Sequence, residues 1–185
     1  MSQAEAEIAT ARVPDTPTTG PLAPAARGLN RLNVWIDRLG AVSLIAASLV
    51  LTYSVFSRYF FKAATDWQDE AAVFLIVGAI FMAGAYVQSY RGHIGIEAIA
   101  SVLPAGVNRV RAILVDAGSM LFCAFFSWKS WTLLHEAVVD KQTTSSSWAP
   151  PLWIPYGLMA LGMTLLAVQI ALQLAAHFAK KAATR

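Results

Sequence analysis

Residues 71–90 read AAVFLIVGAIFMAGAYVQSY, a run of 20 residues without a charged side chain between Glu70 and Arg91. A helix needs about 20 mostly apolar residues to cross a hydrocarbon core that is about 30 Å thick. Three further runs have similar length and almost no charge: residues 39–57, 112–134 and 152–176. Four such runs in a chain of 185 residues predict an all-α integral membrane protein with four transmembrane helices.

The flanking residues set the limits of these segments. Residues 1–27 contain four prolines and no apolar run, so we expect a disordered cytoplasmic tail and not a cleaved signal peptide. Residues 28–180 form the membrane domain, and residues 181–185 form a basic C-terminal tail. Within the domain we place the spans at about residues 36–60, 69–90, 109–135 and 152–177.

Composition excludes several classes of protein. Hydrophobic residues make up 57% of the chain and charged residues only 14%, against about 25% charged in a soluble domain. The isoelectric point near 9.2 comes from basic residues beside the spans, which indicates membrane orientation and not nucleic-acid binding. Cys123 is the single cysteine of the chain, so an intramolecular disulfide and a cysteine-ligated metal cluster are both excluded.

The connecting segments alternate in charge. The connection near residues 58–70 has a net charge of −1, whereas the connection that contains Arg91, Arg109 and Arg111 has a net charge of +2. Because Lys and Arg are enriched on the cytoplasmic side, we expect both termini and the middle connection to face the cytoplasm. Asp116 follows Arg111 by five residues and is therefore expected near the cytoplasmic surface.

The middle connection contains a helical pattern of its own at residues 93–103. Ile96, Ile99, Ala100 and Leu103 fall on one face of a helical wheel, and Pro104 ends the pattern. This spacing predicts a short amphipathic helix on the cytoplasmic surface.

Residues that commonly carry chemistry are scattered. His93, His135 and His177 fall on alternating sides of the membrane, and Gly118–Ser119 is more typical of helix packing than of a serine hydrolase. We assign no catalytic, substrate-binding or metal-binding residue and no cofactor, and we expect the chain not to be an enzyme.

Two glutamines on the last span allow two interpretations. Gln169 and Gln173 share one helical face, where they either form hydrogen bonds between helices or, as the minority hypothesis, line a solute path. The first two spans contain no central ionisable residue, although a transporter that acts alone is expected to have one. This pattern favours a supporting subunit.

Three motifs in a fixed order carry a family resemblance. They are Arg58-Tyr59-Phe60-Phe61, Trp67-Gln68-Asp69-Glu70 and Arg91-Gly92-His93-Ile94, followed by the Pro- and Trp-rich segment Trp148–Pro155. Over about residues 31–176 the chain resembles the small membrane subunit of TRAP (tripartite ATP-independent periplasmic) transporters.

The resemblance implies a division of labour among three components in the bacterial inner membrane and periplasm. A periplasmic solute-binding protein captures an organic acid anion. A large multi-span membrane subunit moves the anion by an elevator-type motion and uses the sodium gradient. The small subunit packs against the large subunit, contacts membrane lipids and binds no solute.

The candidate functional residues of this chain follow from the motifs and the flanking charges. For partner contact or assembly they are Arg58, Tyr59, Trp67, Glu70, Arg91 and His93, and for lipid headgroups they are Arg91, Arg109 and Arg111. We expect Arg58 to pair with Glu70 across the first helical hairpin. The alternative is that both side chains extend separately into water.

Two other functions remain open from the sequence. The chain could be the membrane anchor of a redox enzyme, for which a haem absorbance band would be the sign. It could also be a self-sufficient four-helix transporter, for which transport in liposomes without other chains would be the sign.

Overall fold

The computed structural model describes residues 23–90 and 104–183. Its elements are, in chain order, α2 (Ala23–Phe56), the π-helical turn η1 (Ser57–Phe61), α3 (Asp66–Ser89), α5 (Ala105–Val139) and α6 (Trp153–Ala183). Four helices within these ranges are long and apolar enough to cross a membrane, and many of their large apolar side chains are exposed. The predicted all-α, multi-pass membrane fold is confirmed.

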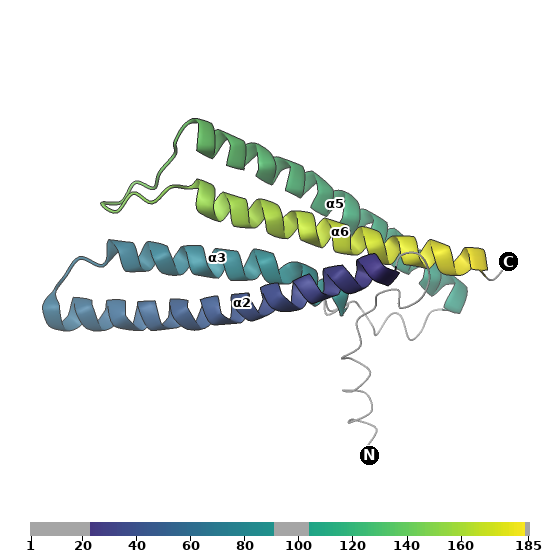
Figure 1. The fold of residues 1–185 in the computed structure, drawn as a ribbon, viewed down its shortest axis with the longest axis horizontal. Coiled ribbons are helices and arrows are strands. Elements are labelled where there is room, and N and C mark those ends of the chain that lie inside the picture. Colours follow the sequence, from purple (N-terminus) through teal and green to yellow (C-terminus); the bar gives the residue numbers. More distant parts are fainter. Residues whose placement is uncertain (1–22, 91–103, 184–185) are drawn as a thin grey trace, which may run out of the picture.

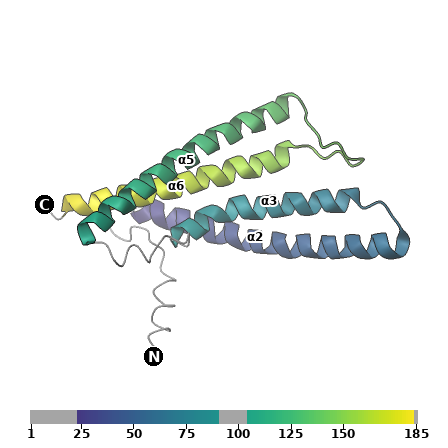
Figure 2. The same cartoon turned by 180° about the vertical axis from the view of Figure 1, so that it is seen from behind.

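Over most of their length the four helices lie side by side in one row, in the order α2, α3, α6 and α5, and near the start of α2 Asn33 also bonds Gln169 of α6 directly. Figure 1 shows this order, and Figure 2 shows the same order from behind. In agreement, α3 contacts both α2 and α6, while α5 contacts α6. We call the end with connections 57–65 and 140–152 the loop end, and the end where α2 begins and α6 finishes the terminal end.

Local chemistry explains how the first hairpin turns at the loop end. Helix α2 ends in the wide turn η1, and the next residue, Lys62, has a left-handed backbone with φ of 49°. Asp66 and Asp69 then occupy the first turn of α3. Their negative charges are stabilised by the partial positive charge of a helix N-terminus, so this sequence favours a new helix at this point.

Glycines bring α3 and α6 into close contact. A Cβ atom on Gly162 of α6 would overlap the backbone carbonyl of Phe81 on α3. On the opposite helix, a Cβ on Gly78 would lie 2.9 Å from the Cδ1 atom of Leu158. Without a hydrophobic effect between helices in lipid, close van der Waals contact of this kind is a main source of association. The α3–α6 interface is therefore the structural centre of the row.

Small residues also line the contact between α2 and α3. A Cβ on Gly40 would lie 3.7 Å from the Cα atom of Ala79, and both residues are buried. Ala47, also on α2, is 2% exposed. Small residues at these positions allow the two helices to pack closely.

The observed bounds differ from the predicted ones at the terminal end. Helix α2 begins at Ala23, so residues 23–27 are helical and the predicted disordered tail was wrong there. Helix α6 continues to Ala183, beyond the predicted end at residue 177 and into the predicted tail. In both cases mostly alanine and basic residues, APAAR at 23–27 and FAKKAA at 178–183, continue the helix beyond the apolar run, because alanine, arginine and lysine favour helix. The predicted surface helix at 93–103 lies outside the described residues.

Candidate functional site

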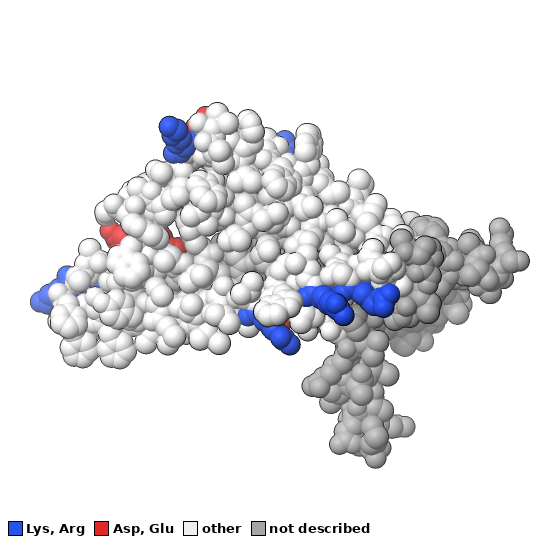
Figure 3. Space-filling view, viewed as in Figure 1, with Lys and Arg blue, Asp and Glu red and all other residues white. Residues whose placement is uncertain are grey.

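Polar side chains from both hairpins meet at the loop end. We call this group the loop-end rim, and it consists of Arg58, Thr65, Asp66, Asp69, Glu70, Ser146 and Ser147. Figure 3 shows the charged side chains of one face gathered towards the two ends of the molecule, with an expanse without charge between them. The rim thus lies where the helices leave the apolar region.

Arg58 joins the end of α2 to the start of α3. Its Nη2 atom donates to Asp69 Oδ2 at 3.0 Å and to Thr65 Oγ1 at 2.7 Å, and its Nε atom also donates to Thr65 Oγ1 at 3.2 Å. Ser54 Oγ donates to the second carboxylate oxygen of Asp69 at 3.1 Å. One exposed arginine therefore connects the two helices of the first hairpin.

The predicted partner of Arg58 was wrong. Arg58 forms its ion pair with Asp69, with side chains 62% and 50% exposed, whereas Glu70 faces the α5–α6 connection. Successive residues of a helix differ by about 100° in direction, so only one of two adjacent carboxylates can face α2. The orientation of α3 about its own axis turns Asp69 toward α2.

Serines of the connection 140–152 bind the other two carboxylates of α3. Ser146 Oγ donates to Glu70 Oε2 at 2.8 Å, and Ser147 Oγ donates to Asp66 Oδ2 at 2.9 Å. Ser146 Oγ also accepts the backbone N–H of Ala149 at 3.2 Å. These bonds tie the second hairpin to the first. The two serines could not be identified from the sequence, because nothing in a Ser-rich loop indicates its distant partner.

Two aromatic candidates lie at the same end without polar partners in the rim. Tyr59 is 78% exposed and contacts the ring of Phe60 edge to face at 5.1 Å, while Trp67 is 47% exposed. Their exposure makes them available for contact with lipid or another protein. Neither side chain has a role in holding the rim together.

The candidates at the terminal end are only partly described. Arg111 Nε donates to Asn108 Oδ1 at 3.0 Å. Arg109 lies in the first part of α5, and Arg91 and His93 fall outside the described residues. The structure therefore brings Arg58 together with Asp69, and Glu70 with Ser146. The roles expected for Arg91, His93, Arg109 and Arg111 stay predictions.

Amide side chains form a second polar group near the terminal end. Gln88 Nε2 donates to Gln173 Oε1 at 2.9 Å, and Gln173 Nε2 donates to the backbone carbonyl of Gln88 at 3.0 Å. Asn33 Nδ2 donates to Gln169 Oε1 at 3.2 Å. The predicted hydrogen bonding of Gln169 and Gln173 between helices is confirmed. Asn33 and Gln88 were missed, since Asn33 precedes the first apolar run and a single amide at Gln88 carries no periodic signal.

Asp116 is buried, a property that its expected position near the cytoplasmic surface did not indicate. It is 5% exposed and has an interaction partner, and it is the one buried acid or base among the side chains that the structure describes. It lies six residues, or about 9 Å along the helix, from the middle of α5. Among the same residues no group of three His, Cys, Asp or Glu side chains could hold a metal ion.

Comparison with known proteins identifies the family. The family described as "Tripartite ATP-independent periplasmic transporters, DctQ component" matches residues 47–180. The C4-dicarboxylate TRAP transporter small permease protein DctQ of Vibrio cholerae is 23% identical over 175 residues, which cover 76% of this chain and 75% of the relative. The isethionate TRAP transporter permease protein DctMQ of Oleidesulfovibrio alaskensis is 25% identical over 138 residues. That match covers 71% of this chain but only 22% of the relative.

The matched region begins in the last third of α2 and ends within α6, so it includes the loop-end rim, the end of the first span and the other three spans. A transporter component is not an enzyme, and the redox-anchor hypothesis falls with it. The four-span row, the motifs at the loop end and the match over most of the chain agree, and the chain belongs to the DctQ component family of tripartite ATP-independent periplasmic transporters, as a small permease subunit.

Proposed function

We propose that this chain is the scaffold subunit of a sodium-coupled transporter that takes up an organic acid anion across the bacterial inner membrane. A periplasmic binding protein delivers the anion, and a large multi-span subunit moves it and uses the sodium gradient. The small permease packs against that large subunit and has no solute or sodium ligand. The relative that is named for C4-dicarboxylate supports the organic acid.

This proposal rests on the polar contacts within the row and on the apolar surface of the row. A transport path needs polar or ionisable groups around a central cavity, yet the described carboxylates of the loop-end rim bind hydrogen-bond donors of this same chain. The amides of α6 likewise bind α2 and α3. What the row offers outward is mainly apolar side chains, which suit lipid or the helices of another subunit.

The length of one relative supports the large partner. The chain matches only 22% of the DctMQ permease, so most of that protein lies outside the match. We propose that the corresponding large subunit is a separate chain here, and that it covers part of the apolar surface of the row.

Orientation follows from the charges. We propose that the loop end faces the periplasm and that both termini face the cytoplasm, where Arg91, Arg109 and Arg111 contact anionic lipid headgroups. Tyr59 and Trp67 then lie on the periplasmic side, within reach of the binding protein. Cysteine labels at Ala64 and Ser145, which are exposed, should react from outside intact cells, whereas a label at Ser101 should not. The reverse pattern would overturn this orientation.

Uptake measurements test the scaffold role against a solute path. Deletion of the chain should abolish uptake, while Gln169→Ala, Gln173→Ala and Asp116→Asn should leave the apparent solute affinity of the assembled transporter unchanged. Uptake is normalised to the amount of complex that co-purifies with a tagged large subunit. A shift in solute affinity of tenfold or more, with normal complex yield, would place the mutated side chain in the solute path. Transport by this chain alone in liposomes would contradict the proposal as a whole.

A further inference from the structure

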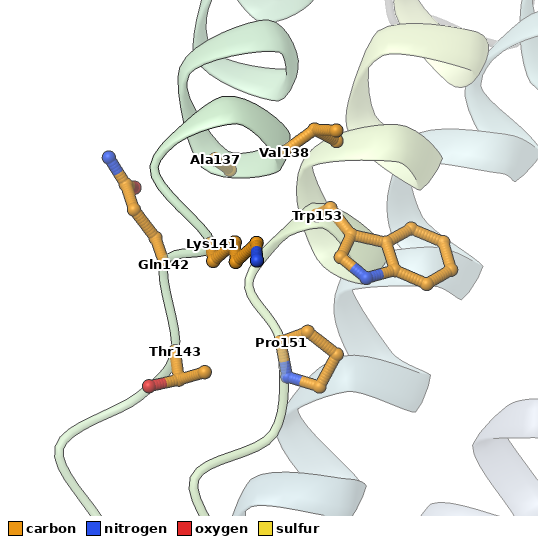
Figure 4. Close-up of a pocket in the computed structure, with 7 residues that line it drawn as sticks. All are labelled: Ala137, Val138, Lys141, Gln142, Thr143, Pro151 and Trp153. Atoms are coloured by element: carbon orange, nitrogen blue, oxygen red, sulfur yellow. The ribbon is translucent and has the colours of Figure 1, made fainter.

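A pocket of about 420 Å³ lies at the loop end between the end of α5 and the start of α6. Its lining includes the apolar residues Ala137, Val138, Pro151 and Trp153 and one cation, Lys141 (Figure 4). None of these residues belongs to the loop-end rim, so the pocket is a separate feature of the second hairpin.

Backbone hydrogen bonds fix the walls of the pocket. Gln142 N–H donates to the Ala137 carbonyl at 3.0 Å, which closes the end of α5. Leu152 N–H donates to the Gln142 carbonyl at 3.0 Å, and Thr143 and Pro151 form an antiparallel bridge. The two sides of the connection are thus held together before the first residue of α6. These bonds hold both walls of the pocket in place.

Lys141 is placed in this pocket by its backbone. Its φ of 50° is in the left-handed region, and Figure 4 shows its side chain extending from the end of α5 toward the segment that leads to Trp153. The nearby carboxylate of Asp140 lies 3.5 Å from Gln142 Nε2, and Glu136 stands one turn earlier on α5. Among residues 23–90 and 104–183 the ion pair is Arg58–Asp69, so neither carboxylate forms an ion pair with Lys141 there.

The pocket lies at the depth of lipid headgroups. Helix α6 enters its apolar stretch at Trp153, and the Leu152–Gln142 hydrogen bond holds Lys141 at the same level. Tryptophan side chains are enriched at the boundary between headgroups and hydrocarbon. Val138 and Trp153, which are 54% and 50% exposed, continue the apolar lining toward the hydrocarbon from this level.

We infer that the pocket binds one glycerophospholipid of the leaflet at the loop end, with the lipid phosphate on the Lys141 ammonium and the upper part of an acyl chain on Val138 and Trp153. A lysine near a membrane surface contributes about 1 kcal/mol of attraction to an anionic headgroup. A free organic anion would meet the same single exposed charge without the apolar contact, so the shape and lining of the pocket favour the lipid.

Native mass spectrometry of the full-length chain in detergent tests this inference with three probes. Dioleoyl phosphatidylglycerol supplies both phosphate and acyl chains, dioleoylglycerol lacks the phosphate, and glycerol 3-phosphate lacks the acyl chains. Lys141→Gln removes the charge and Lys141→Arg retains it. Lys62→Gln is the matched control, because Lys62 also follows the end of a loop-end helix with a left-handed backbone, φ 49°, but does not line this pocket.

The expected result is a first phosphatidylglycerol adduct about fivefold weaker in Lys141→Gln, and unchanged in Lys141→Arg and Lys62→Gln. Dioleoylglycerol should bind all four proteins equally. Equal loss in Lys62→Gln, or no loss in Lys141→Gln, would overturn the site. Glycerol 3-phosphate that binds as tightly as the lipid would assign the pocket to a free phosphate and overturn the lipid. Circular dichroism of each variant checks that the helices are retained. Retained binding in Lys141→Arg shows that the loss in Lys141→Gln comes from the missing charge and not from a lost fold.

Discussion

Helices α6 and α2 are both apolar spans, yet they stand in different environments. Helix α6 lies between two helices, and 33% of its apolar stretch is buried, against 17% in α2. Its amides reach both α2 and α3. Helix α2 lies at the edge of the row, and Val42, Ile45 and Leu49 on it are more than 60% exposed. Two helices of similar apolar composition thus have different roles: α6 holds the row together, and α2 faces the surroundings.

The difference indicates which residues contribute most to the stability of this protein. In lipid an exposed leucine has apolar neighbours whether or not the helices have associated, so its contribution to association is small. Close contacts and hydrogen bonds between helices, in contrast, exist only after association. Substitutions on α6 should therefore cost far more stability than substitutions on the outward face of α2.

The largest effect is expected at Gly162. A Cβ there meets the backbone of Phe81, so Gly162→Ala should destabilise the helix association by about 2–3 kcal/mol, as overpacking in a tight interface does. Gly118→Ala on α5 is the matched control, because a Cβ at Gly118 meets nothing within 4 Å. Its effect should be neutral or stabilising by up to about 1 kcal/mol, from helix propensity alone. Unfolding by SDS in mixed micelles measures both, and equal effects would contradict the proposed centre of the row.

A smaller effect is expected from the amides between α3 and α6. Gln173→Leu removes both recorded bonds with Gln88 and should cost about 1–2 kcal/mol, because hydrogen bonds between transmembrane helices are modest in strength. Thr52→Val on α2 is the comparison, since Thr52 Oγ1 bonds the Ser48 carbonyl of its own helix. It should change stability by less than about 0.5 kcal/mol. A larger loss for Thr52→Val would remove the contrast between the two helices.

The loop-end rim should contribute less to stability than the amides between α3 and α6. A double-mutant cycle with Arg58→Gln and Asp69→Asn should give a coupling energy below about 1 kcal/mol that falls with added salt, since both side chains are largely exposed. The parallel cycle of Arg58→Gln with Glu70→Gln should give no coupling, because Glu70 binds Ser146. Coupling of Arg58 to Glu70 in place of Asp69 would show that α3 is rotated relative to the structure.

The smallest effect on stability is expected on the outward face of α2. Ile45→Ala and Leu49→Ala should each change the unfolding free energy in micelles by less than about 0.5 kcal/mol, because both side chains are exposed. If the large subunit covers this edge, the same variants should lower the yield of co-purified complex. Destabilisation as large as that of Gly162→Ala would mean that α2 is packed within the chain itself.

Much of the fold could be predicted from the sequence, because run length and flanking charge decide which segments span a membrane. The candidate residues Arg58 and Glu70 were correctly sought at the helix ends, but their partners were not identified. Asp69 and Glu70 are adjacent in sequence, and only the rotation of α3 separates them. The bonds of Ser146 to Glu70 and of Asn33 to Gln169 connect distant positions, and their residue types alone do not predict such pairs. The order of the helices in the row could likewise not be predicted from the sequence pattern.

The arrangement in a row also has a consequence for the geometry of assembly. Helices about 10 Å across give four neighbours in line a long side of about 40 Å, and a hydrocarbon core about 30 Å thick makes that side roughly 1,200 Å² in projected area. An ordinary stable protein interface buries about 800 Å² on each partner. One long side therefore offers enough area for a permanent neighbour while the other stays solvated by acyl chains. A square bundle of the same helices would present sides half as long, and no single side would reach that area.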